Sequence, residues 1–234
     1  KLCGDKVLSK TGRGVFAAMF LFAFSGAAQA ACPAANQFNY SFANAAAATL
    51  NYANSYNYTA SNGQGQNQAF TVSFLTNGLS SSIVSSTQLP AISNLVTDGV
   101  AARNLVVGGI FTGRTTNVAT NTRVVVTIFT FATPVRDFPI QVNDVDFAAN
   151  QYRDWLQING INGASTYDPS LTTPFGNNNT TPGPHSATGS AQLIGATTTP
   201  LTLTVRQSGG TGASGNNATE GTITASFAQP VRSE

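Results

Sequence analysis

Apolar and polar residues alternate in many short stretches after residue 30, a period of two that is typical of half-buried β-strands. The clearest sets are Phe38, Tyr40 and Phe42, then Phe70, Val72 and Phe74. Further strands are predicted at residues 105–112, 123–131, 138–145, 155–158, 201–205 and 223–227. Turns rich in Asn, Gly and Ser separate these segments, and only residues 43–50 have the composition of a short helix or a strand connection. The pattern predicts an all-β fold, an antiparallel β-sandwich of the jelly-roll-like kind.

Residues 10–30 break this pattern and predict a secretory signal peptide. Lys10 and Arg13 give a positive start, residues 15–24 form an uninterrupted apolar run, and Ala28 and Ala30 fit a small-residue cleavage site. The run is shorter than the roughly 20 apolar residues of a transmembrane helix. We therefore expect a leader and signal-peptide helix at residues 1–30 that is removed on export. Residues 31–234 then form a single β-sandwich domain, secreted or at the cell surface, with no membrane insertion after signal removal.

One short motif occurs twice, as FATPVR at residues 131–136 and FAQPVR at residues 227–232. Pro134 predicts a turn in the first copy, because proline cannot donate to a strand ladder, and the next strand begins near Phe138. The second copy stands at the end of the sequence, so we expect no strand after its turn. The sandwich is then truncated at its C-terminus and leaves a sheet edge open.

Charge narrows the classes of partner. The whole chain has a net charge of +2, but four of its basic residues belong to the predicted leader. The remaining domain has seven arginines, eight acidic residues and no lysine, which leaves it close to neutral. Nucleic acid and anionic membranes select basic surfaces, so neither is an expected partner.

Acidic residues gather in one segment, RDFPIQVNDVDFAANQYRDW, at residues 136–155. On an extended strand Asp144 and Asp146 share one face, with side chains roughly 6–7 Å apart. Calcium needs further oxygen ligands, and those available nearby are Asn143, Asn150 and Asp154. A structural calcium site at Asp144, Asp146 and Asp154 is therefore one interpretation. The other is that these carboxylates end a strand or pair with Arg136 and Arg153.

Catalysis is not expected. Glycoside hydrolysis uses two carboxyls facing each other across a cleft, whereas these acids cluster within one hairpin. His185 is the one histidine, and the chain has no Gly-x-Ser-x-Gly elbow for a serine nucleophile. The aromatic side chains of Tyr152, Trp155 and Tyr167 are candidates for stacking on glycans, although a Trp at the start of a strand also fills cores.

The motifs around this segment resemble a group of exported bacterial β-sandwich modules, the choice-of-anchor type of surface protein. The residues that carry the resemblance are Phe131, Pro134, Val135, Asp144, Asp146, Arg153, Asp154 and Trp155. The resemblance implies a jelly-roll-like sandwich at the surface of a Gram-negative bacterium, often the first part of a longer adhesin-like protein. It implies no catalytic residues.

These observations rank three functions. The first is a non-enzymatic surface or extracellular-matrix module in adhesion or assembly, including a filament or layer subunit that joins its own copies through an open sheet edge. The second is a carbohydrate-binding module with structural calcium, and the third is a glycoside hydrolase. The expected partners are cell-surface or matrix components, glycans or other copies of the chain.

Overall fold

The computed structural model describes residues 2–4, 36–97, 102–112, 123–145, 147–148, 152–153, 155–167, 169–172, 206–208, 215–216 and 222–233. Strands dominate the described residues, and no helix occurs among them. Every pairing between described strands is antiparallel. The predicted all-β fold is therefore confirmed. The predicted signal-peptide helix and the predicted strand at residues 201–205 lie outside the described residues.

The main sheet is built on a long strand, β12 (Val124–Arg136). Residues 124–131 of β12 pair with β5 (Asn67–Asn77), and β5 pairs in turn with β4 (Tyr56–Ser61). The opposite side of β12 carries β22 (Val231–Ser233), followed by β17 (Gly160–Asn162) and β18 (Ser165–Tyr167). Alternate residues of β5 are buried, which confirms the period read from Phe70, Val72 and Phe74.

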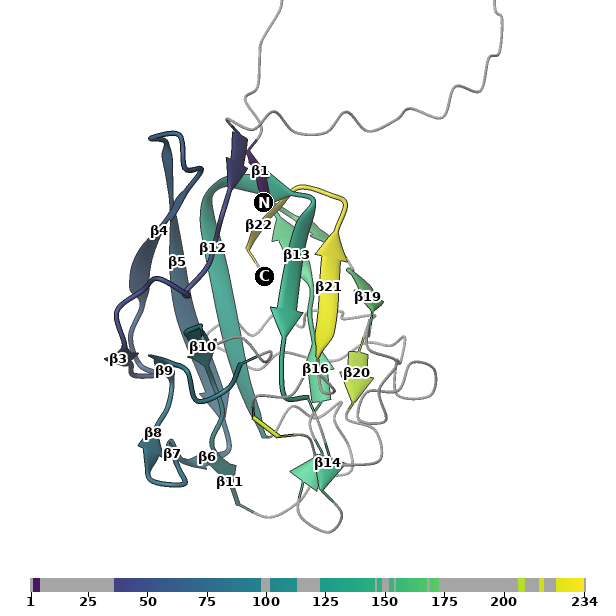
Figure 1. The fold of residues 1–234 in the computed structure, drawn as a ribbon. Helices are drawn as coiled ribbons and strands as arrows, with labels where there is room; N and C mark the ends of the chain where they lie inside the picture. The colour runs from purple at the N-terminus through teal and green to yellow at the C-terminus, as the bar shows by residue number, and fades with distance from the viewer. Residues whose placement is uncertain are drawn as a thin grey trace, which may run out of the picture.

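A second sheet lies to the right of β12 in Figure 1, in the order β13 (Phe138–Val142), β21 (Ile223–Phe227) and β19 (Ser170–Thr172). One hydrophobic core joins the two layers, with Phe70, Val72 and Phe131 from the first sheet and Phe138 and Phe227 from the second. Apolar residues from both sheets pack against one another between the layers, which is the arrangement of a β-sandwich.

Short strands complete the described part of the fold. They are β3 (Ala48–Thr49), β6 (Leu79–Ser81), β7 (Ile83–Val84), β8 (Thr87–Gln88), β9 (Ala91–Ser93), β10 (Asn104–Val106), β11 (Ile110–Phe111), β14 (Phe147–Ala148), β15 (Tyr152–Arg153), β16 (Trp155–Gln157) and β20 (Arg206–Ser208). Residues 43–50 contain a turn and then β3, which pairs with β9. The structure thus selects the strand connection over the short helix.

The two copies of the repeated motif meet in space, because Val135 of β12 pairs with Val231 of β22. Both valines are completely buried. In the first copy the chain does not turn at Pro134. It continues to Arg136, turns at Asp137 with φ 53° and enters β13 at Phe138. The predicted turn at Pro134 was wrong because a register shift between Thr130 and Val135 accommodates the proline inside the strand.

The second copy turns before its proline, and β22 follows that turn. β22 pairs with β12 on one side and with β17 on the other. The expectation that no strand follows this turn was therefore wrong, because three residues suffice to fill the place between these two neighbours.

Three residues of the predicted leader also belong to the main sheet. β1 (Leu2–Gly4) pairs with the end of β12 and with β2 (Gln37–Phe38). Removal of residues 1–30 remains a prediction, and it would take β1 out of the sheet. Among the residues described, no helix is long and apolar enough to cross a membrane.

Candidate interaction surface

The outward face of β4, β5 and β12 carries a row of small polar side chains beside apolar residues such as Val126 and Ile128. Asn57 of β4 lies opposite Thr71 of β5, and Thr71 lies opposite Thr130 of β12. The Thr71 hydroxyl donates to the Asn57 carbonyl Oδ1 at 3.0 Å. Asn57 and Thr130 are exposed, as is Thr59 two residues further along β4. We call this row, Asn57, Thr59, Thr71 and Thr130, the polar face.

Charge is missing from the whole of this region. No Asp, Glu, Lys, Arg or His occurs in β4, in β5 or in residues 124–135 of β12. The first charged residue along β12 is Arg136, whose Nε lies 3.5 Å from Oδ2 of Asp137. Both side chains are well exposed, and such ion pairs contribute little to stability. The polar face therefore presents hydrogen-bonding groups without charged side chains.

Aromatic rings support these strands from the inside. The ring of Tyr58 stacks on that of Phe70 with centroids 5.5 Å apart, and Phe42 meets Tyr58 edge-on at 5.2 Å. Tyr40 packs edge-on against Phe131, with centroids 5.1 Å apart. Burial raises the pKa of Tyr58 and of Tyr40, so both rings stay neutral at physiological pH. The outward residues are thus held on a closely packed aromatic layer.

The Tyr40 hydroxyl is buried and has no hydrogen-bond partner in the described part of the chain. A buried hydroxyl without a partner costs free energy because it has left water without replacing the bonds it made there. The ring of Tyr40 therefore contributes to the core, whereas its hydroxyl works against stability.

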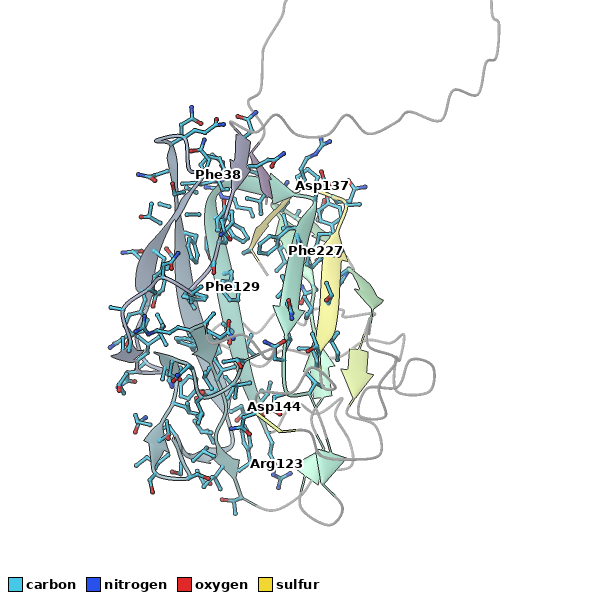
Figure 2. The ribbon with its side chains drawn as sticks, viewed as in Figure 1. Phe38, Arg123, Phe129, Asp137, Asp144 and Phe227 are labelled. Carbon is cyan, nitrogen blue, oxygen red and sulfur yellow. The ribbon has the colours of Figure 1, made fainter. Side chains whose placement is uncertain are left out.

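The acidic segment is only partly described. Asp144 follows β13, is half-buried and has φ 61°, a conformation that Asp tolerates better than most residues. Figure 2 shows Asp137 and Asp144 at opposite ends of β13. Asp146 and Asp154 lie outside the described residues. Within those that are described, no three His, Cys, Asp or Glu side chains form a group that could hold a metal ion.

Asn143 has a defined role in this loop. Its Oδ1 accepts hydrogen bonds from Nε2 of Gln141 at 3.2 Å and from Oγ1 of the buried Thr222 at 3.3 Å. An amide oxygen has two lone pairs, so both are used in this arrangement. Asn143 therefore ties β13 to the start of β21. The calcium site at Asp144, Asp146 and Asp154 stays a prediction.

The three predicted glycan-stacking residues do not form a described cluster. Tyr152 and Trp155 begin β15 and β16, and only their main chain is described. Tyr167 ends β18, opposite Gly160, and its half-buried ring packs against the hydrophobic core. This contact gives Tyr167 a packing role, and glycan stacking stays a prediction. His185 lies outside the described residues.

Sequence reasoning missed the polar face. Its one signal was the complete lack of charged residues between Arg13 and Asp98, which takes in β4 and β5. Alternation along a strand separates its two faces but does not say which face is outward. Thr71 and Thr130 are placed on the outward face only by the pairing of β5 with β12.

Comparison with known proteins gives no relative: no family model, no curated protein and no solved structure matches the chain.

Proposed function

We propose that this chain is an exported, non-enzymatic surface or extracellular-matrix module of a Gram-negative bacterium that acts in adhesion or assembly. The observation that carries the proposal is the uncharged polar face of β4, β5 and β12. Export rests on the predicted signal peptide, and the bacterial surface rests on the resemblance to choice-of-anchor modules.

The physical reason is that charge normally keeps folded proteins apart. Like charges on two copies repel each other and maintain solubility and the monomeric state, whereas a surface without charge allows close approach. The side chains of Asn57, Thr59, Thr71 and Thr130 also offer hydrogen bonds to a polar, uncharged partner such as a matrix polymer.

The polar face does not favour catalysis. General acid–base chemistry needs a titratable group within hydrogen-bond reach of the reacting atoms, and β4, β5 and residues 124–135 contain no acid, histidine or lysine. A contact function needs only a rigid scaffold and accessible polar groups, which the aromatic layer beneath these strands supports.

The test uses protein purified after export, with its N-terminus sequenced to locate the cleavage site. We expect it to be recovered with cells, with matrix or as assemblies of itself, in amounts that change little between low and high salt, because the polar face carries no charges for salt to screen. It should degrade no glycan in a substrate screen. A freely dispersed monomer that binds neither cells nor matrix, or one that hydrolyses a glycan, would refute the proposal.

A further inference from the structure

β4 lies at the outer edge of the main sheet, on the left in Figure 1. Among the described strands it pairs with β5 and with no other. One contact reaches its outer side, where the N–H of Asn39 donates to the carbonyl of Ser61 at 3.1 Å. An edge strand presents main-chain donors and acceptors that a further strand can use.

The direction of these main-chain groups follows from two hydrogen bonds. In an antiparallel strand the N–H and C=O of one residue point to the same side, and neighbouring residues alternate. The N–H of Asn62 donates to the carbonyl of Gln66, at the turn into β5, so even-numbered residues point toward β5. Ser61 points away from β5 toward Asn39. Asn57 and Thr59 therefore point away from β5 as well.

Apart from the Asn39 contact at Ser61, β4 lacks the devices that usually protect a sheet edge. Natural edges carry Lys, Pro, inward charges or bulges. The sequence of β4, YNYTAS, contains none of these residues, and its register with β5 runs without a bulge from Tyr56 to Ser61. Nothing on this edge repels another uncharged strand.

We propose that the β4 edge pairs antiparallel with the β4 edge of a second copy of this chain. Asn57 of one copy lies opposite Thr59 of the other, so that a twofold axis passes beside Tyr58. Each such pair exchanges two main-chain hydrogen bonds, and the symmetry makes both pairs equivalent. The order β12, β5, β4 then continues across the axis as one sheet. This inference rests on the proposed function in assembly and names the surface and the partner.

A second copy is the occupant because this edge is self-complementary. Twofold pairing needs the same patch on both partners, and a strand without charge meets its own copy without like-charge repulsion. A charged partner would find no complementary residue on β4, whose six residues include no Asp, Glu, Lys or Arg.

The key variant is Thr59→Pro, measured by sedimentation velocity on the exported protein over a range of concentrations. Proline is tolerated on an edge strand where its missing N–H faces outward, so the fold is kept. The change removes one donor from each of the two pairs and should weaken dimerisation about tenfold to a hundredfold. Ala60→Pro is the contrasting variant: its N–H points toward β5, so this change should lower Tm as well.

A second pair of variants separates the edge from the polar face. Thr59→Lys places a charge on the edge, and Thr130→Lys makes the same change on the exposed side of the interior strand β12. We expect Thr59→Lys to give monomers and Thr130→Lys to dimerise like the unaltered protein. Hydrogen exchange should show the amides of Asn57 and Thr59 protected at high protein concentration and exposed at low concentration.

The outcomes distinguish the two proposals. Loss of dimers in both Thr59 variants, with native Tm and with Thr130→Lys unaffected, supports pairing at β4. Dimers that persist in both Thr59 variants, or that Thr130→Lys also abolishes, overturn pairing at β4 and leave the assembly function standing. A protein that stays monomeric yet binds cells or matrix overturns the edge pairing alone. A monomer that binds neither overturns both.

Discussion

The hydroxyl of Tyr52 holds residues 107–109 against the sandwich, and Tyr52→Phe measures what this attachment contributes. The hydroxyl donates to the Gly108 carbonyl at 2.7 Å and accepts from the Gly108 N–H at 2.9 Å. Its ring packs edge-on against Phe74 with centroids 5.3 Å apart, a contact that phenylalanine keeps. The substitution therefore removes two hydrogen bonds and leaves the packing in place.

The size of the expected loss in stability follows from the half-buried position of the Tyr52 hydroxyl. One intramolecular hydrogen bond contributes about 1 kcal/mol net, and a donor left unpaired in a half-buried site costs the same order again. We expect Tyr52→Phe to lower the free energy of unfolding by about 2 kcal/mol, which corresponds to a fall in Tm of roughly 4–8 °C for a domain of this size.

The assay is urea unfolding followed by far-ultraviolet circular dichroism. The midpoint should move to lower urea while the m value stays constant, because the surface exposed on unfolding is unchanged. The matched control is Tyr56→Phe, which removes one hydrogen bond, from the Asn51 N–H at 2.7 Å, at an exposed site where water replaces it. If Tyr52→Phe costs no more than Tyr56→Phe, the double bond to Gly108 does not carry the stability assigned to it.

Four further predictions concern packing, an unpaired hydroxyl, ionisation and metal binding. In Gly160→Ala the new Cβ would lie 2.2 Å from Cγ1 of Val231, so overpacking should cost about 1–3 kcal/mol in chemical denaturation, whereas Gly215→Ala, with open space around it, should be neutral. Tyr40→Phe removes the unpartnered hydroxyl and should raise the free energy of unfolding by about 1 kcal/mol, and a loss of stability would contradict that account. Because burial raises the pKa of Tyr40 above its unfolded value, Tyr40 ionises first in the unfolded chain, and the free energy of unfolding falls as the pH rises above about 10. Tyr40→Phe removes this ionisation and should lose less stability in alkali than the unaltered protein. The calcium prediction requires a rise in Tm at millimolar calcium that Asp146→Ala abolishes; no shift in the unaltered protein removes it.

The sequence predicted the main strands because their burial follows a period of two. Phe70, Val72 and Phe74 lie on the inner face of β5 as expected, and the strand predicted at residues 123–131 is observed from Val124 as the first part of β12. The extension of β12 to Arg136 was not predictable, because it depends on a register shift against β22, a strand almost a hundred residues later in the sequence.

Residues 43–50 show the same limit. Alanine favours helix locally, but Ala48 and Thr49 pair with β9, and this distant pairing overrides the local preference. The candidate interaction surface was hidden for a related reason. The sequence of β4, YNYTAS, does not predict that this strand lies at an edge, because an edge position depends on which strands are its neighbours.

The partners of β12 have a consequence for the order in which this protein is made and folded. β12 pairs with β5 on one side and with β22, at residues 231–233, on the other, so its sheet is incomplete until residues 231–233 are available. Val231 and Phe227 also complete the core around Val135 and Phe131. A chain threaded through a membrane from its N-terminus would therefore remain loosely structured until residues 227–233 had crossed, and the arrival of these residues would let the sandwich close on the far side.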